Sequence, residues 1–326
     1  MSRQVIINAD DFGLSPSVNQ GIIQAYLAGG ITSTSMMVNM PGLDHAVSSA
    51  CSLPDLGIGL HFNLTYGRPV SEPSQVPSLV NPDGSFYKGD NVTIRDIADI
   101  AKELDAQWNA FIQTSFTPTH LDSHQLLHQN DPRIYKIMAE KAVRENIPLR
   151  RSQIRHSIPD LSAPRMTDTI LLDTYEGPEG LRRLLHHLSS LRAGVTEIVC
   201  HPGYVDDVLR DISNWLDIRE HELKVFINPI IPRTLQELGI IPINYKTMNA
   251  IPDAYSELLP IRTPIPIPGS GTLTLPVISP TSLTSTKKTR YLRQRLSKQQ
   301  RIIKALRMSS KRRAKARTVS RKTRKH

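Results

Sequence analysis

Short apolar runs alternate with segments of helical periodicity along the chain as far as Tyr245. The first run, Val5–Ala9, is continuous rather than alternating and therefore predicts a buried strand. Ser15–Ser17 has the composition of a helix start, and the apolar spacing after it predicts a helix over Val18–Leu27. The further strands that we expect are Thr32–Met40, Gly57–Phe62, Thr117–Asp122, Pro148–Arg151, Thr196–His201 and Ile240–Tyr245, and the further helices are Ile94–Phe116, Arg133–Glu145, Gly180–Leu191 and Pro232–Leu238.

This alternation favours an α/β fold with a parallel sheet, because parallel strands need crossover connections that are usually helices. About seven expected strands favour closure of the sheet into a barrel rather than an open arrangement. The length of 326 residues allows one large domain or two small ones.

The composition changes in the last third of the chain. Six prolines fall within Leu258–Thr286 among many Ser, Thr and Gly, which is typical of an extended linker. The segment after it is basic; Tyr291–Met308 has the spacing of an amphipathic helix, and we expect the rest to be disordered on its own. The predicted organisation is a folded domain (1–255), a linker (256–286) and a basic tail (287–326).

The net charge of +10 and the pI of about 9.7 taken alone suggest a protein that binds nucleic acid or an anionic surface. The charge is unevenly distributed, however. Residues 287–326 contain 18 Lys and Arg and no acid, which leaves 22 basic and 30 acidic residues before them and a net charge of −8. The acidic part gives no charge-based reason to expect a nucleic-acid substrate.

The sequence lacks the features typical of disulfide-rich, cysteine-zinc, secreted and membrane-spanning proteins. Its two cysteines, Cys51 and Cys200, cannot form a disulfide framework or a cysteine-based zinc module. The first residues carry too short an apolar stretch for a secretory signal, and no apolar run approaches the roughly 20 residues of a spanning helix. We therefore expect a cytoplasmic protein.

Histidine and aspartate gather at the ends of four expected strands. In parallel α/β folds, ligands bind beyond the carboxyl ends of the strands, so these residues would share one rim. Each also has a purely structural interpretation, as a helix cap, a core histidine, a solvated helix face or a plain turn. Their joint placement makes a functional site the better hypothesis. They are Asp10 and Asp11 after the first strand, His61, the group His120, Asp122 and His124, and His201.

Two imidazoles and one carboxylate can bind a divalent cation and leave positions open for water and substrate. Such a site suits hydrolysis, with a second carboxylate taking a proton from the water. Neighbouring residues on a strand point to opposite faces, so Asp10 and Asp11 both reach a pocket only if the chain turns there. We expect Phe12-Gly13 to supply that turn. The arrangement does not fit a glycosidase pair, whose carboxyl groups flank a sugar bond about 5–9 Å apart.

Five segments occur in an order that is informative beyond their individual residues. They are Val5–Ser15 (Val-Ile-Ile-Asn-Ala-Asp-Asp-Phe-Gly-Leu-Ser), Ile31–Asn39, Gly57–Thr65, Pro118–Gln125 and Cys200–Tyr204. In sequence and order they resemble the YdjC/ChbG family of carbohydrate deacetylases, over about residues 3–246. The resemblance implies an irregular (β/α) barrel related to the NodB-type polysaccharide deacetylases, a divalent metal, and removal of N-acetyl groups from an amino sugar such as a chitooligosaccharide.

Matched motif by motif, the resemblance implies that Asp11, His61 and His124 bind the metal. It implies that Asp10 is the general base that activates metal-bound water. His201 would be the general acid for the leaving amine, or would orient Asp10. The resemblance leans towards Mg²⁺, whereas a set of two histidines and one aspartate also accepts Zn²⁺.

His120 and Asp122 are expected to support His124 from behind, since a carboxylate commonly fixes the tautomer of a metal-binding imidazole. The proline-rich insertion Thr65–Val92 is expected to form part of a lid or substrate wall. Residues that bind the sugar cannot be assigned from the motifs.

Two alternatives stay open. The same metal hydrolase could act on another acylated sugar, for example a lipid-linked one, because substrate loops are not readable from motifs. Alternatively, the chain could be a binding or scaffold protein acting through residues 287–326, which could engage nucleic acid or an anionic membrane weakly. A homodimer is expected from the resemblance alone.

Overall fold

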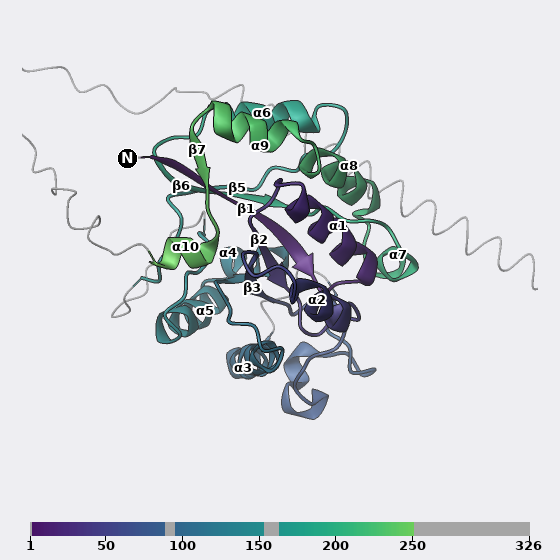
Figure 1. Ribbon diagram of the computed structural model, residues 1–326. Helices are drawn as coiled ribbons and strands as arrows, with labels where there is room; N and C mark the ends of the chain where they lie inside the picture. Colours follow the sequence, from purple (N-terminus) through teal and green to yellow (C-terminus); the bar gives the residue numbers. More distant parts are fainter. Residues whose placement is uncertain (1, 89–94, 153–162, 251–326) are drawn as a thin grey trace, which may run out of the picture. The chain divides into compact units, whose positions relative to one another are not determined.

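The computed structural model describes residues 2–88, 95–152 and 163–250, which belong to one compact unit (Figure 1). The predicted linker and basic tail lie outside the described residues. Within the described part of the chain, no helix is both long and apolar enough to cross a membrane.

The described residues form a seven-stranded sheet in which every pair of neighbouring strands is parallel. Six strands follow the order β4-β3-β2-β1-β6-β5, and β7 pairs with β1. The strands are β1 (Arg3–Phe12), β2 (Ser33–Met36), β3 (Gly57–Phe62), β4 (Leu121–Ser123), β5 (Thr169–Leu171), β6 (Gly194–Cys200) and β7 (Ile240–Pro242).

One edge of β1 is shared by two strands. Residues Arg3–Val5 of β1 pair with β7, and the stretch from Asn8 to Phe12 pairs with β2. The sheet therefore curls around β1 with its strands flanked by helices, and the expected irregular (β/α) barrel is confirmed (Figure 1). The continuous apolar run that predicted β1 is buried because the strand lies in the middle of this sheet.

The predicted strand at Pro148–Arg151 is wrong. Only Leu149 pairs there, in a single parallel bridge with Leu121, and its N–H donates to Arg165 O at 3.0 Å. The chain leaves the ladder after that bridge because the next side chain, Arg150, is buried against carboxylates from three strands. The four residues Pro-Leu-Arg-Arg do not reveal that constraint, because the carboxylates that Arg150 meets come from distant strands.

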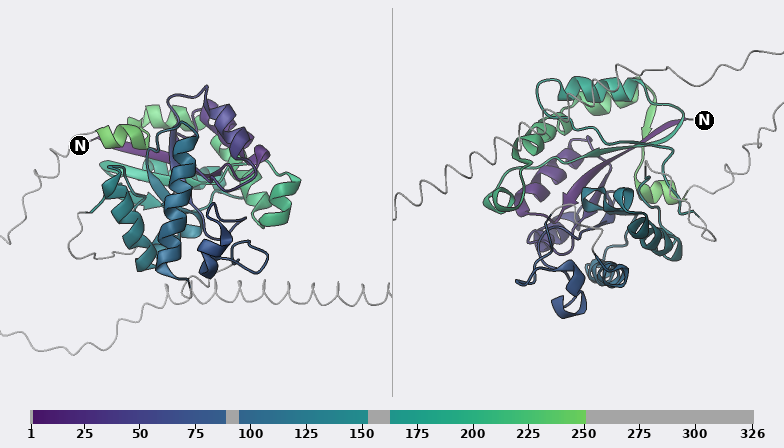
Figure 2. Two further views of the ribbon diagram at one scale, coloured as in Figure 1. Left: turned by 90° about the horizontal axis from the view of Figure 1, so that it is seen from below. Right: turned by 180° about the vertical axis from the view of Figure 1, so that it is seen from behind.

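Helices flank the sheet, with α3 and α5 beside β3 and β4 and with α6, α8 and α9 towards the β5–β6 edge (Figures 1 and 2). Four of the described helices begin at a side chain that caps the backbone: Ser15, Asp96, Asp131 and Asp206. The α-helices are α1 (Pro16–Leu27), α2 (Leu43–Ala50), α3 (Ile97–Gln113), α4 (Leu127–Asn130), α5 (Pro132–Arg144), α6 (Gly180–Ser189), α7 (Asp207–Ile212), α8 (Leu216–Phe226), α9 (Ile230–Glu237) and α10 (Tyr245–Ala250), with 3₁₀ turns η1 (Pro73–Gln75), η2 (Pro77–Leu79) and η4 (His124–Leu126).

One close approach of backbone positions a functional segment. A Cβ on Gly21 of α1 would lie 2.6 Å from the Cα of Gly203, so only glycine allows α1 to pack this closely against the loop after β6. That loop carries His201, and the contact fixes its path beside the end of β1.

Candidate metal centre and active site

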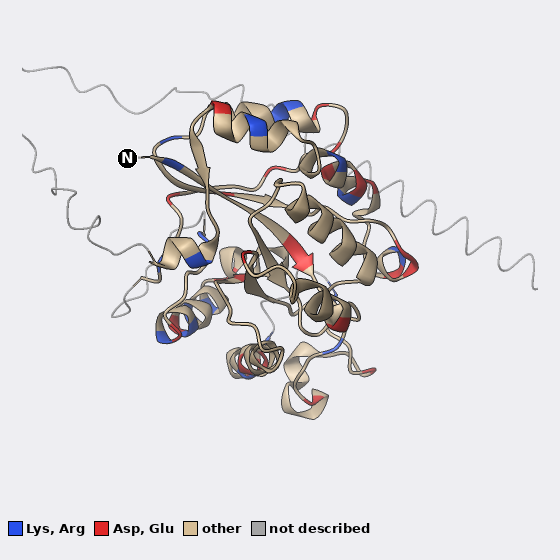
Figure 3. Ribbon diagram, in the orientation of Figure 1, with Lys and Arg blue, Asp and Glu red and all other residues tan. Residues whose placement is uncertain are grey.

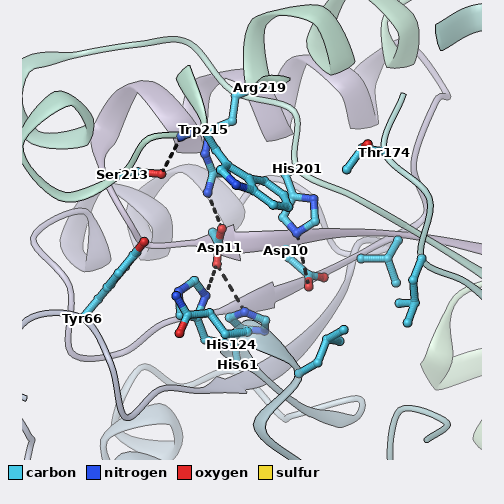
Figure 4. A pocket seen from close by; sticks show the side chains of 14 residues that line it. Asp10, Asp11, His61, Tyr66, His124, Thr174, His201, Ser213, Trp215 and Arg219 are labelled. Atoms are coloured by element: carbon cyan, nitrogen blue, oxygen red, sulfur yellow. Dashed lines mark hydrogen bonds and ion pairs between the residues drawn. The ribbon is translucent and has the colours of Figure 1, made fainter. Parts of the chain in front are cut away.

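A pocket of about 360 Å³ opens at the carboxyl ends of the strands (Figure 4). Its lining includes five of the residues singled out in the sequence, Asp10, Asp11, His61, His124 and His201. They come from the ends of β1, β3 and β6 and from η4, directly after β4. The structure thus brings the predicted strand ends together at one rim, where the end of β1 is visibly acidic in Figure 3.

The predicted turn at Phe12-Gly13 is present, with Leu14 N–H donating to Asp11 O at 3.1 Å and Gly13 at a φ of 91°, and the backbone is already irregular at Asp11. Asp11 has a φ of 72°, and the pairing of β1 with β2 shifts register between Ala9 and Phe12. A non-glycine residue in the left-handed region is uncommon and interrupts the alternation of a strand. Asp10 and Asp11 therefore both line the pocket although they are adjacent in the sequence.

Asp11 lies at the centre of the first cluster, which we call the Asp11 cluster: Asp11, His61, His124 and Arg219 (Figure 4). Oδ1 of Asp11 is 2.9 Å from Nδ1 of His124 and 3.2 Å from Nε2 of His61. Its other oxygen, Oδ2, accepts a short hydrogen bond from Nη2 of Arg219. Burial favours the neutral acid, but Arg219 and His124 outweigh it and hold the pKa of Asp11 well below its usual range.

The Asp11 cluster fits a divalent metal ion. One potential ligand atom from each of Asp11, His61 and His124 lies within 4.8 Å of the others, and all three residues are buried. Nε2 of His124 is buried and has no hydrogen-bond partner among the described residues. A set of two imidazoles and one carboxylate is a common ligand set for a metal that keeps open positions.

Asp10 belongs to a second cluster, the Arg150 cluster: Arg150, Asp10, Asp122 and Glu197. Arg150 donates to Oδ2 and Oδ1 of Asp10 at 2.7 and 2.6 Å, and to Glu197 at 2.8 Å. It also pairs with Asp122 at 2.8 Å. Burial would raise the pKa of Asp10, but Arg150 and His61 hold it below the usual value. Asp10, His61 and Asp122 form a second possible ligand group, but Arg150 already supplies the cation there.

Asp122 supports His61 rather than His124, which corrects the expectation from the sequence. Oδ1 of Asp122 is 2.7 Å from Nδ1 of His61, because these two residues are register partners on β4 and β3. This contact leaves Nε2 of His61 to face Asp11. Burial alone would lower the pKa of His61, but Asp122 and Asp10 raise it to about 10.

His120 is a core histidine rather than a support for His124. Its ring stacks on Tyr245 with centroids 3.9 Å apart, and Nδ1 lies 3.0 Å from the hydroxyl of Thr119. Glycine at position 59 makes room for it, since a Cβ there would lie within 2.6 Å of the imidazole. Burial lowers the pKa of His120 to about 3, so the ring is neutral.

His201 lies beside Asp10, with Nε2 3.8 Å from Oδ2 (Figure 4). Its backbone N–H donates to Glu222 on α8, and the ring meets Trp215 edge to face with centroids 5.0 Å apart. Burial, only partly offset by Asp10 and Asp11, lowers the pKa of His201 to about 4. The imidazole is therefore neutral at neutral pH.

Four functional side chains were missed in the sequence: Arg150, Arg219, Glu222 and Trp215. Arg150 is the next-to-last residue of the expected strand Pro148–Arg151, so a search for arginine as well as Asp and His at strand ends would have found it. Arg219 and Glu222 lie one turn apart on α8, a helix that the apolar spacing did not predict. Nothing in the sequence around α8 signals that it faces the site.

Several known proteins are similar to this chain in sequence or in fold. The sequence profile of the YdjC-like protein family matches residues 4–237. A carbohydrate deacetylase of Geobacillus stearothermophilus is 36% identical over 250 residues, covering 76% of this chain and 98% of the relative. A carbohydrate deacetylase of Thermoanaerobacter pseudethanolicus is 33% identical over 76% of this chain and 100% of its own length. A crystal structure of a putative cellobiose-phosphate cleavage protein from Enterococcus faecalis matches with a TM-score of 0.68 and 30% identity, over 76% of this chain and 99% of that one.

Proposed function

The chain belongs to the YdjC-like family, and from this premise we propose that it is a carbohydrate deacetylase that removes N-acetyl groups from amino sugars or chitooligosaccharides by metal-assisted amide hydrolysis. The observation that carries the proposal is the pairing of two adjacent carboxylates with different partners in one pocket. Asp11 faces two imidazoles, and Asp10 is held by Arg150.

Asp11, His61 and His124 are the residues that would hold the metal. A divalent cation at this site lowers the pKa of water and polarises a carbonyl group, which suits attack on an acetyl amide. Mg²⁺ is the ion favoured by the resemblance, and Zn²⁺ is the ion that the nitrogen-rich ligand set also accepts.

Asp10 acts as the general base. Its carboxylate lines the pocket and, because Arg150 lowers its pKa, is ionised at neutral pH. Arg150 binds both carboxylate oxygens and fixes their orientation, so a proton taken from the attacking water arrives at a defined position.

His201 passes a proton to the leaving nitrogen. The neutral imidazole lies within 3.8 Å of Asp10, so it can receive the proton that Asp10 has taken and donate it as the C–N bond breaks. The products are acetate and the free amine. The sequence also allowed a second role, in which His201 only orients Asp10. In that case, removal of the His201 side chain would affect activity but would not change the order of the proton transfers.

Two aromatic side chains are placed to bind a sugar. Trp215, 40% exposed, and Tyr66, from the predicted substrate wall, both line the pocket (Figure 4). Aromatic rings bury the apolar face of a sugar while leaving its hydroxyls to polar groups. An acylated sugar other than an N-acetylated one would use the same two rings, so the substrate must be identified by assay.

The test is acetate release from a panel of N-acetylated sugars and of O-acylated and lipid-linked sugars. Metal-stripped protein is reloaded with Mg²⁺ or Zn²⁺ alone, and acetate is measured enzymatically. We expect release from an N-acetylated amino sugar only after reloading. Activity confined to another acylated sugar would replace the substrate but keep the metal hydrolase, whereas full activity after stripping would contradict the metal role.

A further inference from the structure

Arg219, the cation of the Asp11 cluster, has N–H donors without a partner among the described residues. Its side chain is 2% exposed and lines the pocket, and Nη2 donates to Oδ2 of Asp11 (Figure 4). A guanidinium carries five N–H donors. Nε and Nη1 of Arg219 are buried without a hydrogen-bond partner among the described residues. Burying a cation whose N–H donors have no acceptor costs free energy. A ligand that accepts from these donors explains why an arginine lies at the wall of a pocket.

We propose that Arg219 contacts the substrate and that its free N–H groups bind the oxygen of the acetyl group during hydrolysis. This proposal rests on the proposed function. Asp10, the base, and the Asp11 cluster both line the pocket, so the acetyl group must lie there for reaction. Arg219 borders the same pocket from α8, and its spare donors need an oxygen acceptor.

The reaction makes that contact stronger as it proceeds. The water oxygen forms a bond to the acetyl carbon, its proton goes to Asp10, and the π electron pair of the carbonyl moves onto the carbonyl oxygen. An N–H of Arg219 donates to the resulting anion. The electron pair on that oxygen then re-forms the carbonyl, the C–N bond breaks with its electron pair going to the nitrogen, and the nitrogen takes the proton that His201 received from Asp10. The acetic acid that leaves ionises to acetate. A charged donor binds the anion more tightly than the neutral carbonyl, which lowers the barrier.

The guanidinium is held in place before substrate arrives. Asp11 accepts one of its N–H groups, and the backbone O of Arg219 accepts from Gly203 N at 3.2 Å. One turn later on α8, Glu222 binds the backbone N–H of His201. Helix α8 thus ties together the metal-binding residue Asp11, the loop of His201 and Arg219, so little reorganisation is needed during reaction.

The competing role is purely positional, with Arg219 only orienting Asp11. Substitution of Arg219 distinguishes the two roles, because each role predicts different changes in kcat, metal affinity and acetate binding. The variants Arg219→Gln and Arg219→Lys are compared with Arg210→Gln, an arginine on the neighbouring α7 whose side chain is 57% exposed. For each, kcat and KM are measured at saturating metal, metal affinity by calorimetry, and acetate binding from product inhibition and calorimetry.

For Arg219→Gln we expect kcat to fall by about 10²–10³-fold, as for loss of an oxyanion donor. Metal affinity should stay within about tenfold, and acetate binding should weaken by at least about tenfold, because one charge-assisted contact is lost. Arg219→Lys should have a higher kcat than Arg219→Gln, because lysine keeps the positive charge but lacks the planar set of N–H donors of the guanidinium. Arg210→Gln should behave as the unaltered protein.

Unchanged kcat and acetate affinity in Arg219→Gln at saturating metal would overturn the proposal, and so would a loss of activity that excess metal restores. A thermal melting curve shows whether each variant is folded. If Arg219→Gln is not folded, Arg219→Lys is compared with the unaltered protein instead. If the unaltered protein releases acetate from no sugar, the proposed function fails on its own. Acetate binding still decides the role of Arg219 in that case: its loss in Arg219→Gln supports the contact, and its retention excludes it.

Discussion

Two neighbouring carboxylates in this protein have opposite surroundings. Asp10 and Asp11 are 3% and 1% exposed, so burial does not distinguish them. Both oxygens of Asp10 are taken by the guanidinium of Arg150. Asp11 gives one oxygen to Arg219 and turns the other towards His61 and His124.

The partners, rather than the depth, therefore decide what each carboxylate can do. The bidentate contact with Arg150 balances the charge of the Asp10 carboxylate and fixes its orientation, so Asp10, the proposed base, needs no metal as a counter-ion. Two imidazoles lie next to Asp11 instead, and once deprotonated their ring nitrogens can bind a divalent cation. The left-handed turn at Asp11 makes this division possible within two residues.

Removing the carboxylate charge of Asp10 should have the largest effect. We expect Asp10→Asn to lose about 10²–10⁴-fold in kcat, the usual contribution of a general base. Acetate release measures it, with the exposed Asp207→Asn as the control. His124→Ala should lose metal binding as well as turnover. Near-normal deacetylation by Asp10→Asn would mean that another group takes the proton.

Removing Arg150 should break the second cluster and destabilise the protein. Arg150→Met leaves three buried carboxylates without their cation, so we expect the free energy of unfolding to fall by about 3–5 kcal/mol. Urea unfolding measures it. The matched control is Arg151→Met, which loses a hydrogen bond to the carbonyl of Thr167 but leaves no buried carboxylate without its cation among the described residues, and it should cost about 1 kcal/mol. An equal decrease in the free energy of unfolding of the two variants would show that the Arg150 cluster contributes no more to stability than a single hydrogen bond.

Glu222 should make stability depend on pH in a direction unusual for a carboxylate. Burial, partly offset by the N–H groups of Tyr175 and His201, raises its pKa to about 7 from 4.5. The folded protein then holds more protons than the unfolded chain between these values, so Glu222 makes stability fall as pH rises through them. Over the window the loss is about 3 kcal/mol.

Glu222→Gln should remove that loss. Its stability relative to the unaltered protein should increase by up to about 3 kcal/mol between pH 4.5 and pH 8. Unfolding of both proteins across this range gives the difference, in which the opposite contribution of the neighbouring His201 cancels. A difference that is flat with pH would mean that Glu222 is already ionised near pH 5 in the folded protein.

The smallest effect is expected from removing the basic tail. Both clusters lie within residues 2–250, so a chain ending at Thr286 should keep kcat and KM on small N-acetylated sugars within about twofold. Loss of activity would tie residues 287–326 to the site. Weaker binding to anionic vesicles or nucleic acid at unchanged activity would support the predicted anionic partner.

The candidate metal-binding residues were readable from the sequence because each lies at the end of a buried strand or directly after one. The strand Gly57–Phe62 was predicted to the residue, and its apolar run ends with His61 next to the last position. Asp11, His124 and His201 follow the same rule. Their convergence required only that the strands be parallel, which the alternating helices indicated.

The contacts around these residues were not readable, because they depend on register and on packing. Asp122 reaches His61 because β3 and β4 pair in one particular register, and a sequence motif contains no register. Arg150 follows a single bridge instead of a strand, and Arg219 comes from a helix distant in sequence. The importance of such a side chain follows from the charged groups next to it, and these neighbours are known only once the fold is known.

The most direct test of the division between the two carboxylates is metal binding by Asp10→Asn and Asp11→Asn. Calorimetric titration of Mg²⁺ and Zn²⁺ into metal-stripped protein gives the dissociation constant for each variant. The account predicts that Asp10→Asn binds within about tenfold of the unaltered protein and that Asp11→Asn binds at least about 100-fold more weakly. Equal losses in both variants, or unchanged binding by Asp11→Asn, would contradict it.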